Sequence, residues 1–195
     1  MKTALLIDGG YLRAAAQRIS RNYDVTFIQG FAHNCISPDE YLFRVLYYDA
    51  PQFDGKAKLP VSGEWKKFVS TDRLLDDLAK LERFACRRGS LGFRGWKPKN
   101  LPIEGGKALL DTDFVPIFEQ KGVDMRVGLD IATFAHQRSV ERILLVSGDT
   151  DMVPAMKHAR KAGLEVMLVQ LPPPAYNLHD NLLRHADAVR AAVFP

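Results

Sequence analysis

Short runs of consecutive apolar residues mark the predicted strands of this chain. Residues 4–7, 143–146 and 166–169 are wholly apolar, and residues 43–48 form a fourth run that is apolar apart from Arg44. Runs of this length are typical of strands buried on both faces of a parallel sheet that helices cover. We therefore expect four strands, each closed by polar or turn-forming residues.

Between these runs, apolar residues recur every three or four positions, which is the spacing of amphipathic helices. The spacing predicts helices over residues 11–20, 71–86, 124–137, 152–162 and 178–185. Ser70 or Thr71 is a suitable N-cap for the second helix, and Gly163 is a suitable terminator for the fourth. Strands alternate with helices, so we expect an α/β fold with a doubly wound, mainly parallel sheet.

Two segments lack clear periodicity. Residues 51–63 are predicted to be an exposed loop, and residues 87–112 a basic insertion or loop with an extra strand possible at 90–93. The length of 195 residues suits one domain spanning residues 1–195. The apolar residues 191–194 either complete the core or join two copies of the chain, which makes a homodimer one of two open alternatives.

Composition narrows the class of protein. Hydrophobic residues make up 47% and charged residues 26% of the chain, which excludes disordered and fibrous proteins. Cys35 and Cys86 are too few for a disulfide framework and lack metal-ligand spacing, as expected of a cytoplasmic protein. Only four consecutive apolar residues precede Asp8, and no apolar run reaches the roughly 18 residues of a membrane span, so we expect neither a signal peptide nor a membrane-spanning segment. The net charge of +4 permits nucleic-acid binding without requiring it.

Two of the predicted strands end in acidic residues. Residues 5–7 run into Asp8, and residues 144–148 run into Asp149 and Asp151. If these strands are neighbours in a parallel sheet, their carboxyl ends share the crevice where ligands bind. Three converging carboxylates repel one another, and a bound divalent cation removes that repulsion. All-oxygen ligands favour Mg²⁺ or Mn²⁺, so we expect a metal site there.

Each acid also has an ordinary structural explanation. Asp8 and Asp151 are suitable helix N-caps, and Gly9 and Gly10 are suitable turn residues. Asp124 opens the helix at 124–137 and is the best candidate for a fourth ligand. Asp130 either borders the same cleft or pairs with Arg126 one turn earlier.

Other polar residues also have either a functional or an ordinary structural explanation. Asp49 follows a strand, but Pro51 suggests that it only begins a turn. Ser147 and Thr150 either donate to a phosphate oxygen or serve the backbone of their own turn. The histidines are scattered without a pairing motif: His33, His136, His158, His179 and His185.

Three motifs together resemble the NYN domain, in its LabA-like branch of the PIN-like nucleases. They are Leu6-Ile7-Asp8-Gly9-Gly10, Lys121-Gly122-Val123-Asp124 through Asp130, and Val146-Ser147-Gly148-Asp149-Thr150-Asp151. The resemblance implies a three-layer PIN-like sheet with strand order 3-2-1-4-5 and metal-dependent cleavage of RNA. It assigns the acidic positions of the family to Asp8, Asp124, Asp149 and Asp151. Many relatives have Asn where this chain has Gly10.

The substrate of such a site would need a positive surface. Basic and aromatic residues alternate in one stretch, which suits the phosphates and unpaired bases of single-stranded RNA. These residues are Arg87, Arg88, Phe93, Arg94, Trp96, Lys97, Lys99 and Lys107. The alternative is a solvated loop whose aromatic side chains pack into the core.

The sequence therefore predicts a Mg²⁺- or Mn²⁺-dependent endoribonuclease with Asp8, Asp124, Asp149, Asp151 and Asp130 as catalytic candidates. The competing hypothesis is a non-catalytic RNA-binding or regulatory module that keeps the fold. A phosphohydrolase or response receiver fits less well, because residues 4–8 lack an Asp-x-Asp pair.

Overall fold

The chain divides into two compact units in a computed structural model, which describes residues 1–71, 73–102, 108–174 and 177–195. The larger unit comprises Met1–Asp49, Arg73–Arg88 and Val123–Pro195. The smaller unit comprises Ala50–Asp72 and Gly89–Gly122. It is therefore formed from two segments that interrupt the sequence of the larger unit.

A six-stranded sheet forms the centre of the larger unit, and every neighbouring pair of its strands is parallel. From one edge to the other, the strands are β5 (Phe84–Arg88), β2 (Tyr41–Asp49), β1 (Lys2–Asp8), β8 (Arg142–Val146), β9 (Glu165–Gln170) and β10 (Ala188–Ala191). The first five follow the predicted order 3-2-1-4-5. The order differs from the prediction in its sixth strand, β10, which extends the sheet beyond β9.

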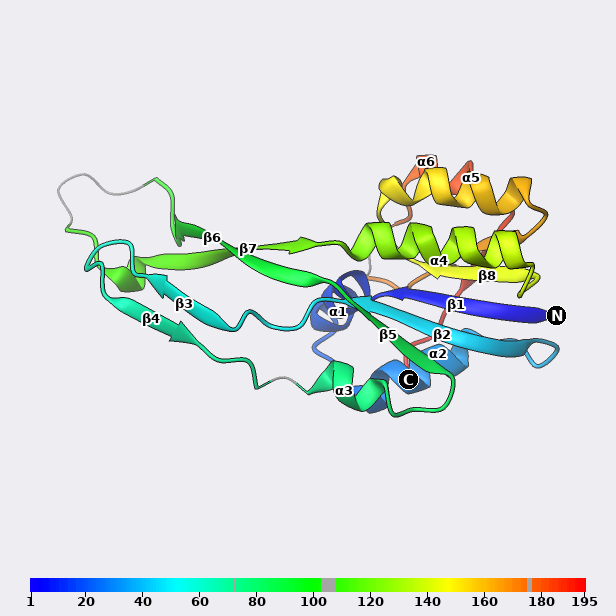
Figure 1. Cartoon of the computed structure of the whole chain (residues 1–195), viewed down its shortest axis with the longest axis horizontal. Helices are drawn as coiled ribbons and strands as arrows, with labels where there is room; N and C mark the ends of the chain where they lie inside the picture. The colour runs from blue at the N-terminus through cyan, green and yellow to red at the C-terminus, as the bar shows by residue number, and fades with distance from the viewer. Residues whose placement is uncertain (72, 103–107, 175–176) are drawn as a thin grey trace. The chain divides into compact units, whose positions relative to one another are not determined.

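Helices cover both faces of this sheet and make three layers (Figure 1). One face carries α1 (Gly9–Arg18), α2 (Val25–Asn34) and α3 (Leu74–Leu78). The other carries α4 (Val123–Gln137), α5 (Val153–Lys161) and α6 (Asp180–Leu183). Alternate residues of β1 supply the two cores: Leu5 and Ile7 pack toward α1 and α2, and Leu6 packs toward α4 and α5.

The predicted helix over residues 71–86 is wrong for most of its length. Among the described residues of this range, only Leu74–Leu78 is helical, and its N-cap is Arg73 rather than Ser70 or Thr71; Asp72 lies outside the described residues. Arg83 has a φ of 64°, which a continuing helix cannot contain. Residues from Phe84 onward pair with β2 instead, so the edge strand β5 takes the place of the helix end.

The helices on the opposite face agree with the prediction. α4 and α5 match the predicted ranges closely, and a 3₁₀ turn, η2 (Thr150–Met152), precedes α5. Gly163 ends α5 with a φ of 89°, as its predicted role requires. α2 was not predicted.

Gly9 and Gly10 are not turn residues, because they form the first turn of α1. At Gly9 a Cβ atom would lie 2.5 Å from the Tyr47 hydroxyl, so close packing, not turn geometry, requires the glycine.

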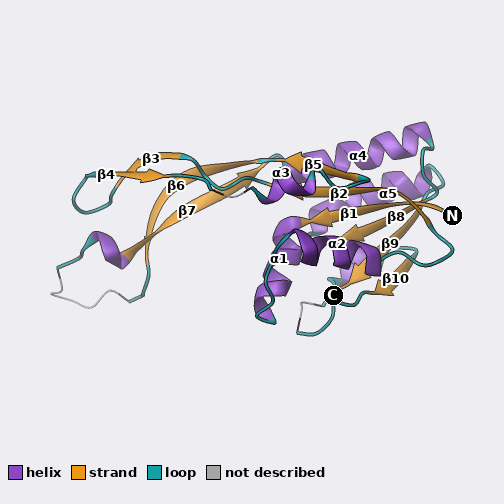
Figure 2. Ribbon diagram, turned by 90° about the horizontal axis from the view of Figure 1, so that it is seen from below, coloured by secondary structure: helices purple, strands orange, loops and turns teal. Residues whose placement is uncertain are grey.

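The smaller unit consists of two antiparallel pairs, shown as orange arrows in Figure 2. β3 (Gly55–Lys58) pairs with β4 (Trp65–Phe68), and β6 (Ser90–Pro98) pairs with β7 (Phe114–Lys121) after a 3₁₀ turn, η1 (Asp111–Asp113). The predicted loop at 51–63 therefore contains a strand. Much of the predicted loop at 87–112 is strand as well, and residues 103–107, including Lys107, lie outside the described residues.

The end of the chain packs onto the larger unit. The ring of Phe194 lies 5.6 Å from that of Phe27 and 6.1 Å from that of Phe31, measured between centroids. This contact agrees with the alternative that residues 191–194 complete the core, and the homodimer stays a prediction. None of the helices in the described part of the chain has the length and apolar composition to cross a membrane.

Candidate active site

The candidate site lies where β1 and β8 end side by side. The two strands are parallel neighbours with Ile7 opposite Val146, as the strand-end prediction requires. Asp8 is the last residue of β1, and Asp149 follows β8 after a two-residue turn. Asp124 lies in the first turn of α4, and Asp151 lies in η2. The fold therefore brings the four predicted acids to one edge of the sheet.

Asp8 is held by its own helix and by the neighbouring strand end. Its Oδ1 accepts a hydrogen bond from the Tyr11 N–H at 3.1 Å, which makes it the N-cap of α1. Its Oδ2 accepts from the Ser147 hydroxyl at 3.4 Å. Burial raises the pKa of Asp8, and the charge of Asp49 adds to the rise, whereas these two hydrogen bonds oppose it.

Asp149 and Asp151 share the turn after β8. The Asp149 side chain accepts from the Asp151 N–H at 2.9 Å, and the Asp149 N–H donates to the Ser147 hydroxyl oxygen at 3.1 Å. Partial burial raises the pKa of Asp124, and the charges of Asp149 and Asp151 raise it further. The Asp124 carboxylate is therefore close enough to Asp149 and Asp151 for their charges to repel it.

Asp8 lines two hollows at this edge. A small enclosed cavity is also lined by Tyr48, Asp124 and Ser147. An open groove of about 590 Å³, here called the strand-end groove, is lined by Asp8, Gly10, Tyr11, Gly148, Asp149, Asn177 and His179. Among the residues that the structure describes, no three His, Cys, Asp or Glu side chains come close enough to hold a metal ion.

The four acids share a second property, which is the absence of a cationic partner. Within the described ranges, no ion pair joins Asp8, Asp124, Asp149 or Asp151 to a lysine or arginine. Their donor atoms are all carboxylate oxygens, the ligand type that Mg²⁺ and Mn²⁺ prefer. The set thus fits such a cation in chemistry, although its side chains are not gathered around one point.

Asp130, the fifth acid candidate, has different surroundings. Its carboxylate accepts from Arg87 Nε at 2.7 Å and Arg87 Nη2 at 3.1 Å, and from the Tyr48 hydroxyl at 2.9 Å. The hydrogen bond to Asp130 raises the pKa of Arg87. The partner of Asp130 is thus Arg87 from β5 and not Arg126 from its own helix.

The sequence indicated the strand-end position of Asp49 but not its burial or its partners. It is the last residue of β2, its side chain is 2% exposed, and it forms an ion pair with Arg13. The Tyr47 hydroxyl donates to it at 3.2 Å, and the Tyr23 hydroxyl, 2.7 Å from that of Tyr47, donates to the Gly9 carbonyl at 3.1 Å. Through the hydrogen bond to the Gly9 carbonyl, this network stabilises the first turn of α1. The strand-end position of Asp49 was its only sequence signal.

Ser147 and Thr150 were the predicted phosphate donors. Ser147 is 2% exposed, and its hydroxyl donates to Asp8. That contact makes Ser147 a support for the Asp8 carboxylate. Thr150 is half-buried at the start of η2.

All three predicted RNA-binding arginines are ion-paired. Arg87 pairs with Asp130 and Arg88 with Asp76, both within the larger unit. Arg94 pairs with Glu119 within the smaller unit.

The aromatic candidates take part in the packing of the smaller unit. Phe93 and Trp96 lie in a cluster of rings with Phe53, Phe68 and Phe118. The Trp96 indole N–H donates to the Lys58 carbonyl at 2.8 Å. Lys97 and Lys99 are exposed. Arg88 and Arg94 are exposed as well, but Lys97 and Lys99 differ from them in forming no ion pair with a described residue.

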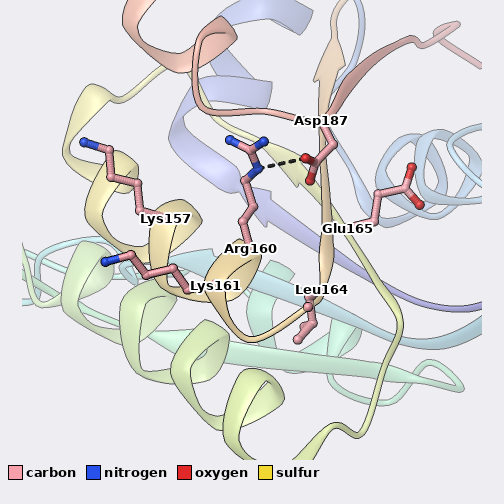
Figure 3. Close-up of a pocket in the computed structure, with 7 residues that line it drawn as sticks. Lys157, Arg160, Lys161, Leu164, Glu165 and Asp187 are labelled. Carbon is pink, nitrogen blue, oxygen red and sulfur yellow. Dashed lines mark hydrogen bonds and ion pairs between the residues drawn. The ribbon is translucent and has the colours of Figure 1, made fainter.

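A second groove, of about 660 Å³, lies at the end of α5 (Figure 3). Arg160 turns toward Asp187 and pairs with it at 2.8 Å, whereas Lys157 and Lys161 point away from this pair. Glu165 also lines the groove and pairs with Arg142. Its charges are therefore partly balanced by the protein itself.

Comparison with known proteins gives three findings. A family model described as NYN domain matches residues 2–190. The uncharacterized protein y4oD of Sinorhizobium fredii (strain NBRC 101917 / NGR234) is 32% identical over 69 residues, which is 35% of this chain and only 32% of that protein. The crystal structure of VPA0982, a protein of unknown function from Vibrio parahaemolyticus RIMD 2210633, is similar with a TM-score of 0.54 at 17% identity. It covers 97% of this chain and 91% of the other, and it supports the fold alone.

Proposed function

The chain belongs to the NYN domain family, within the PIN-like nuclease superfamily, and we propose that it is a metal-dependent endoribonuclease. In this proposal it hydrolyses phosphodiester bonds of single-stranded RNA with Mg²⁺ or Mn²⁺ bound by Asp8, Asp124, Asp149 and Asp151. Its two cysteines are unpaired thiols, the state expected in the cytoplasm, which is the location we propose.

One observation carries the proposal: four acids from three chain segments lie along one sheet edge without a lysine or arginine partner among the described residues. Burial raises the pKa values of Asp8 and Asp124, and the charges of Asp149 and Asp151 raise the pKa of Asp124 further, so ionising these acids is unfavourable in the bare protein. A divalent cation would remove this cost. Such perturbed groups in a hollow are typical of functional sites.

The bound cation would supply the Lewis-acid chemistry, lowering the pKa of a water molecule and stabilising charge on the phosphodiester oxygens. The residues of the chain prepare that step. Ser147 and the Tyr11 N–H hold the Asp8 carboxylate in one orientation, and the Asp151 N–H does the same for Asp149. Attack by water at phosphorus would leave a 5′-phosphate and a 3′-hydroxyl. Neither the attack of water nor the departure of the 3′-oxygen requires a histidine base in this proposal.

The RNA contacts in this proposal come mainly from exposed cations of the smaller unit, Lys97 and Lys99. Arg87, Arg88 and Arg94 contribute less, because each is ion-paired within its own unit. The rings of Phe93 and Trp96 are half-buried, so only their exposed edges are offered to unpaired bases.

A second candidate is a non-catalytic RNA-binding or regulatory module. Two observations favour it: the described carboxylates are not gathered around one point, and Gly10 stands where many relatives have Asn. At Gly10 a Cβ atom would approach Asp8 Oδ1 to 3.4 Å, so a side chain there would lie directly beside the first acid. The module reading predicts RNA binding that no metal converts into cleavage.

Cleavage of labelled single-stranded RNA and DNA, with and without Mg²⁺ or Mn²⁺, separates the two candidates. We expect metal-dependent RNA cleavage that Asp149→Asn lowers about 100- to 1000-fold, because a metal ligand supports several kcal/mol of transition-state stabilisation. The matched control is Asp39→Asn, at an exposed acid before β2, which leaves cleavage unchanged. Equal cleavage by both variants would contradict the nuclease, and RNA binding without cleavage would support the module.

A further inference from the structure

His179 and Asn177 belong to the lining of the strand-end groove. Asp8 and Asp149 line the same groove, and His179 and Asn177 are both exposed to solvent. The groove thus combines carboxylates with neutral hydrogen-bonding side chains. Its volume of about 590 Å³ is within the range of ordinary ligand pockets, roughly 300–1,000 Å³.

The hydrogen bonding of His179 fixes which ring nitrogen is a donor. Its Nδ1 accepts from the Asn181 N–H at 3.1 Å, so Nδ1 carries no proton in this arrangement. The single N–H of the neutral ring is therefore at Nε2, on the far side of the ring from the helix backbone. In the described part of the chain, no hydrogen bond joins this Nε2 to another residue.

Neutral donors suit this position for an electrostatic reason. Arg13 and Arg87 show what a guanidinium does beside an acid in this protein, since each pairs with one and neutralises it. An arginine in the strand-end groove would do the same to Asp8 or Asp149. An imidazole N–H and an amide NH₂ bind phosphate oxygens without taking the carboxylates away from a cation.

One polar group of the turn after β8, the Ser147 hydroxyl, is already engaged. It donates its only proton to Asp8, so it does not serve as the phosphate donor that its sequence position suggested. Asn177 and His179, which line the strand-end groove, are better candidates than Ser147.

We propose that His179 Nε2–H and the Asn177 amide bind the phosphate of the RNA nucleotide next to the cleaved bond. This inference rests on the proposed nuclease function and deepens it by assigning a phosphate subsite to the strand-end groove. Asn177 and His179 come from the segment between β9 and α6, so the subsite joins this segment to the ends of β1 and β8.

The test uses uridine 5′-monophosphate as probe, because it has a phosphate but no bond for the protein to cleave. His179→Ser is the main variant: serine keeps an N-cap acceptor for α6 but lacks the Nε2–H donor. Titration calorimetry with Mg²⁺ present should give a dissociation constant at least about tenfold higher for His179→Ser, since hydrogen bonds to charged groups contribute strongly.

Three controls make the result specific. Asn177→Ala should weaken binding in the same direction, and the exposed helix residue His158, changed to Ser, should leave binding unchanged. Uridine, which lacks the phosphate, should bind equally to the wild type and His179→Ser. A thermal melt should show that His179→Ser folds as stably as the wild type.

Equal affinity of wild type and His179→Ser for the monophosphate would overturn the subsite, even if Asp149→Asn abolishes RNA cleavage. Conversely, His179-dependent binding of the monophosphate in a protein that cleaves no RNA would support the subsite and contradict the nuclease. The two proposals therefore fail in distinguishable ways.

Discussion

The carboxylates of the larger unit form two groups that differ in what faces them. In one group, each acid is matched to an arginine: Asp49 to Arg13 and Asp130 to Arg87. In the other group, Asp8, Asp124, Asp149 and Asp151 have no such partner among the described residues. Both groups contain acids at the ends of parallel strands, since Asp49 ends β2 and Asp8 ends the neighbouring β1.

Glu40 is the most complete example of the matched group. Its side chain is fully buried and pairs with both Arg142 and Arg190, at the opposite end of the strands from the candidate site. Burial alone would raise the pKa of Glu40, but hydrogen bonds from Arg190, the Ser37 N–H and Arg142 lower it to about 2. An acid that the protein neutralises in this way serves the fold.

The comparison shows that position at a strand end does not by itself make an acid functional. Among the described residues, what separates Asp8 from Asp49 is the lack of a cationic partner, so the ionised Asp8 carboxylate has no charge within the described protein to balance it. Such a charge costs stability in the bare protein and is retained where a function requires it.

The largest effect is expected from breaking the matched group at Glu40. Glu40→Gln leaves two largely buried arginines facing a neutral amide, and the free energy of unfolding should fall by about 3–5 kcal/mol. Urea denaturation at neutral pH measures this. Glu82→Gln, at a side chain that is 88% exposed, is the control and should change little.

The pH dependence of stability is a second test of the matched group at Glu40. Its folded pKa is below the ordinary value of 4.5, so its stabilising contribution is present above pH 4.5 and is lost as pH falls toward 2. The stability of Glu40→Gln should therefore vary less over this window than that of the wild type. Parallel curves would contradict the assignment.

Asp130→Asn tests whether Asp130 belongs to the matched group. It weakens the contacts with Arg87 and Tyr48, so we expect about 1–3 kcal/mol less stability and a cleavage rate per folded molecule close to that of the wild type. Urea denaturation and cleavage assays on the same preparation measure the two quantities. A cleavage loss as large as that of Asp149→Asn, with stability intact, would return Asp130 to the catalytic set.

Asp8→Asn tests the unmatched group without any metal. The pKa of Asp8 is raised, so the ionised carboxylate is disfavoured in the folded protein. The protonated form of Asp8 therefore contributes to the free energy of unfolding at low pH, and this contribution is lost as pH rises through the folded pKa. Asn keeps the N-cap. At neutral pH without metal, Asp8→Asn should therefore melt slightly above the wild type, and the difference should vanish at low pH. A lower melting temperature at neutral pH would mean that the Asp8 charge is balanced after all.

The smallest effect concerns RNA affinity. Lys97→Ala with Lys99→Ala should weaken single-stranded RNA binding and reduce the salt dependence by about 0.7 for each phosphate that a lysine no longer neutralises. Arg94→Ala should have a smaller effect, because Arg94 is paired with Glu119. Fluorescence anisotropy at several salt concentrations measures both, and an equal decrease for the two changes would show that this pair opens on binding.

The sequence predicted the parts of the fold that local apolar pattern decides. β1, β2, β8 and β9 are buried on both faces and read as apolar runs. β5 was missed because its residues continue the helical spacing of Leu74 and Leu78, and only its pairing with β2 makes it a strand. α2 had the signals of a helix, with Asp24 as N-cap and Phe27, Ile28 and Phe31 on its buried side, but was not recognised.

The features of the site can be separated in the same way, into those that the local sequence predicts and those that only the fold creates. The positions of Asp8, Asp124 and Asp149 follow from strand ends and from the family resemblance. The partners of Asp49 and Asp130 do not, because Arg13 and Arg87 lie 36 and 43 residues away in the sequence. The position of His179 in the strand-end groove could not be predicted either, because only the fold brings the segment before α6 to the end of β1.

Mg²⁺ binding tests the central claim most directly, because the unmatched acids are proposed to hold a cation whether or not RNA is present. Titration calorimetry should show saturable Mg²⁺ binding to the wild type and to Asp39→Asn, weakened at least about tenfold in Asp8→Asn and in Asp149→Asn. Binding of equal strength in all four proteins, or none in the wild type, would contradict the account.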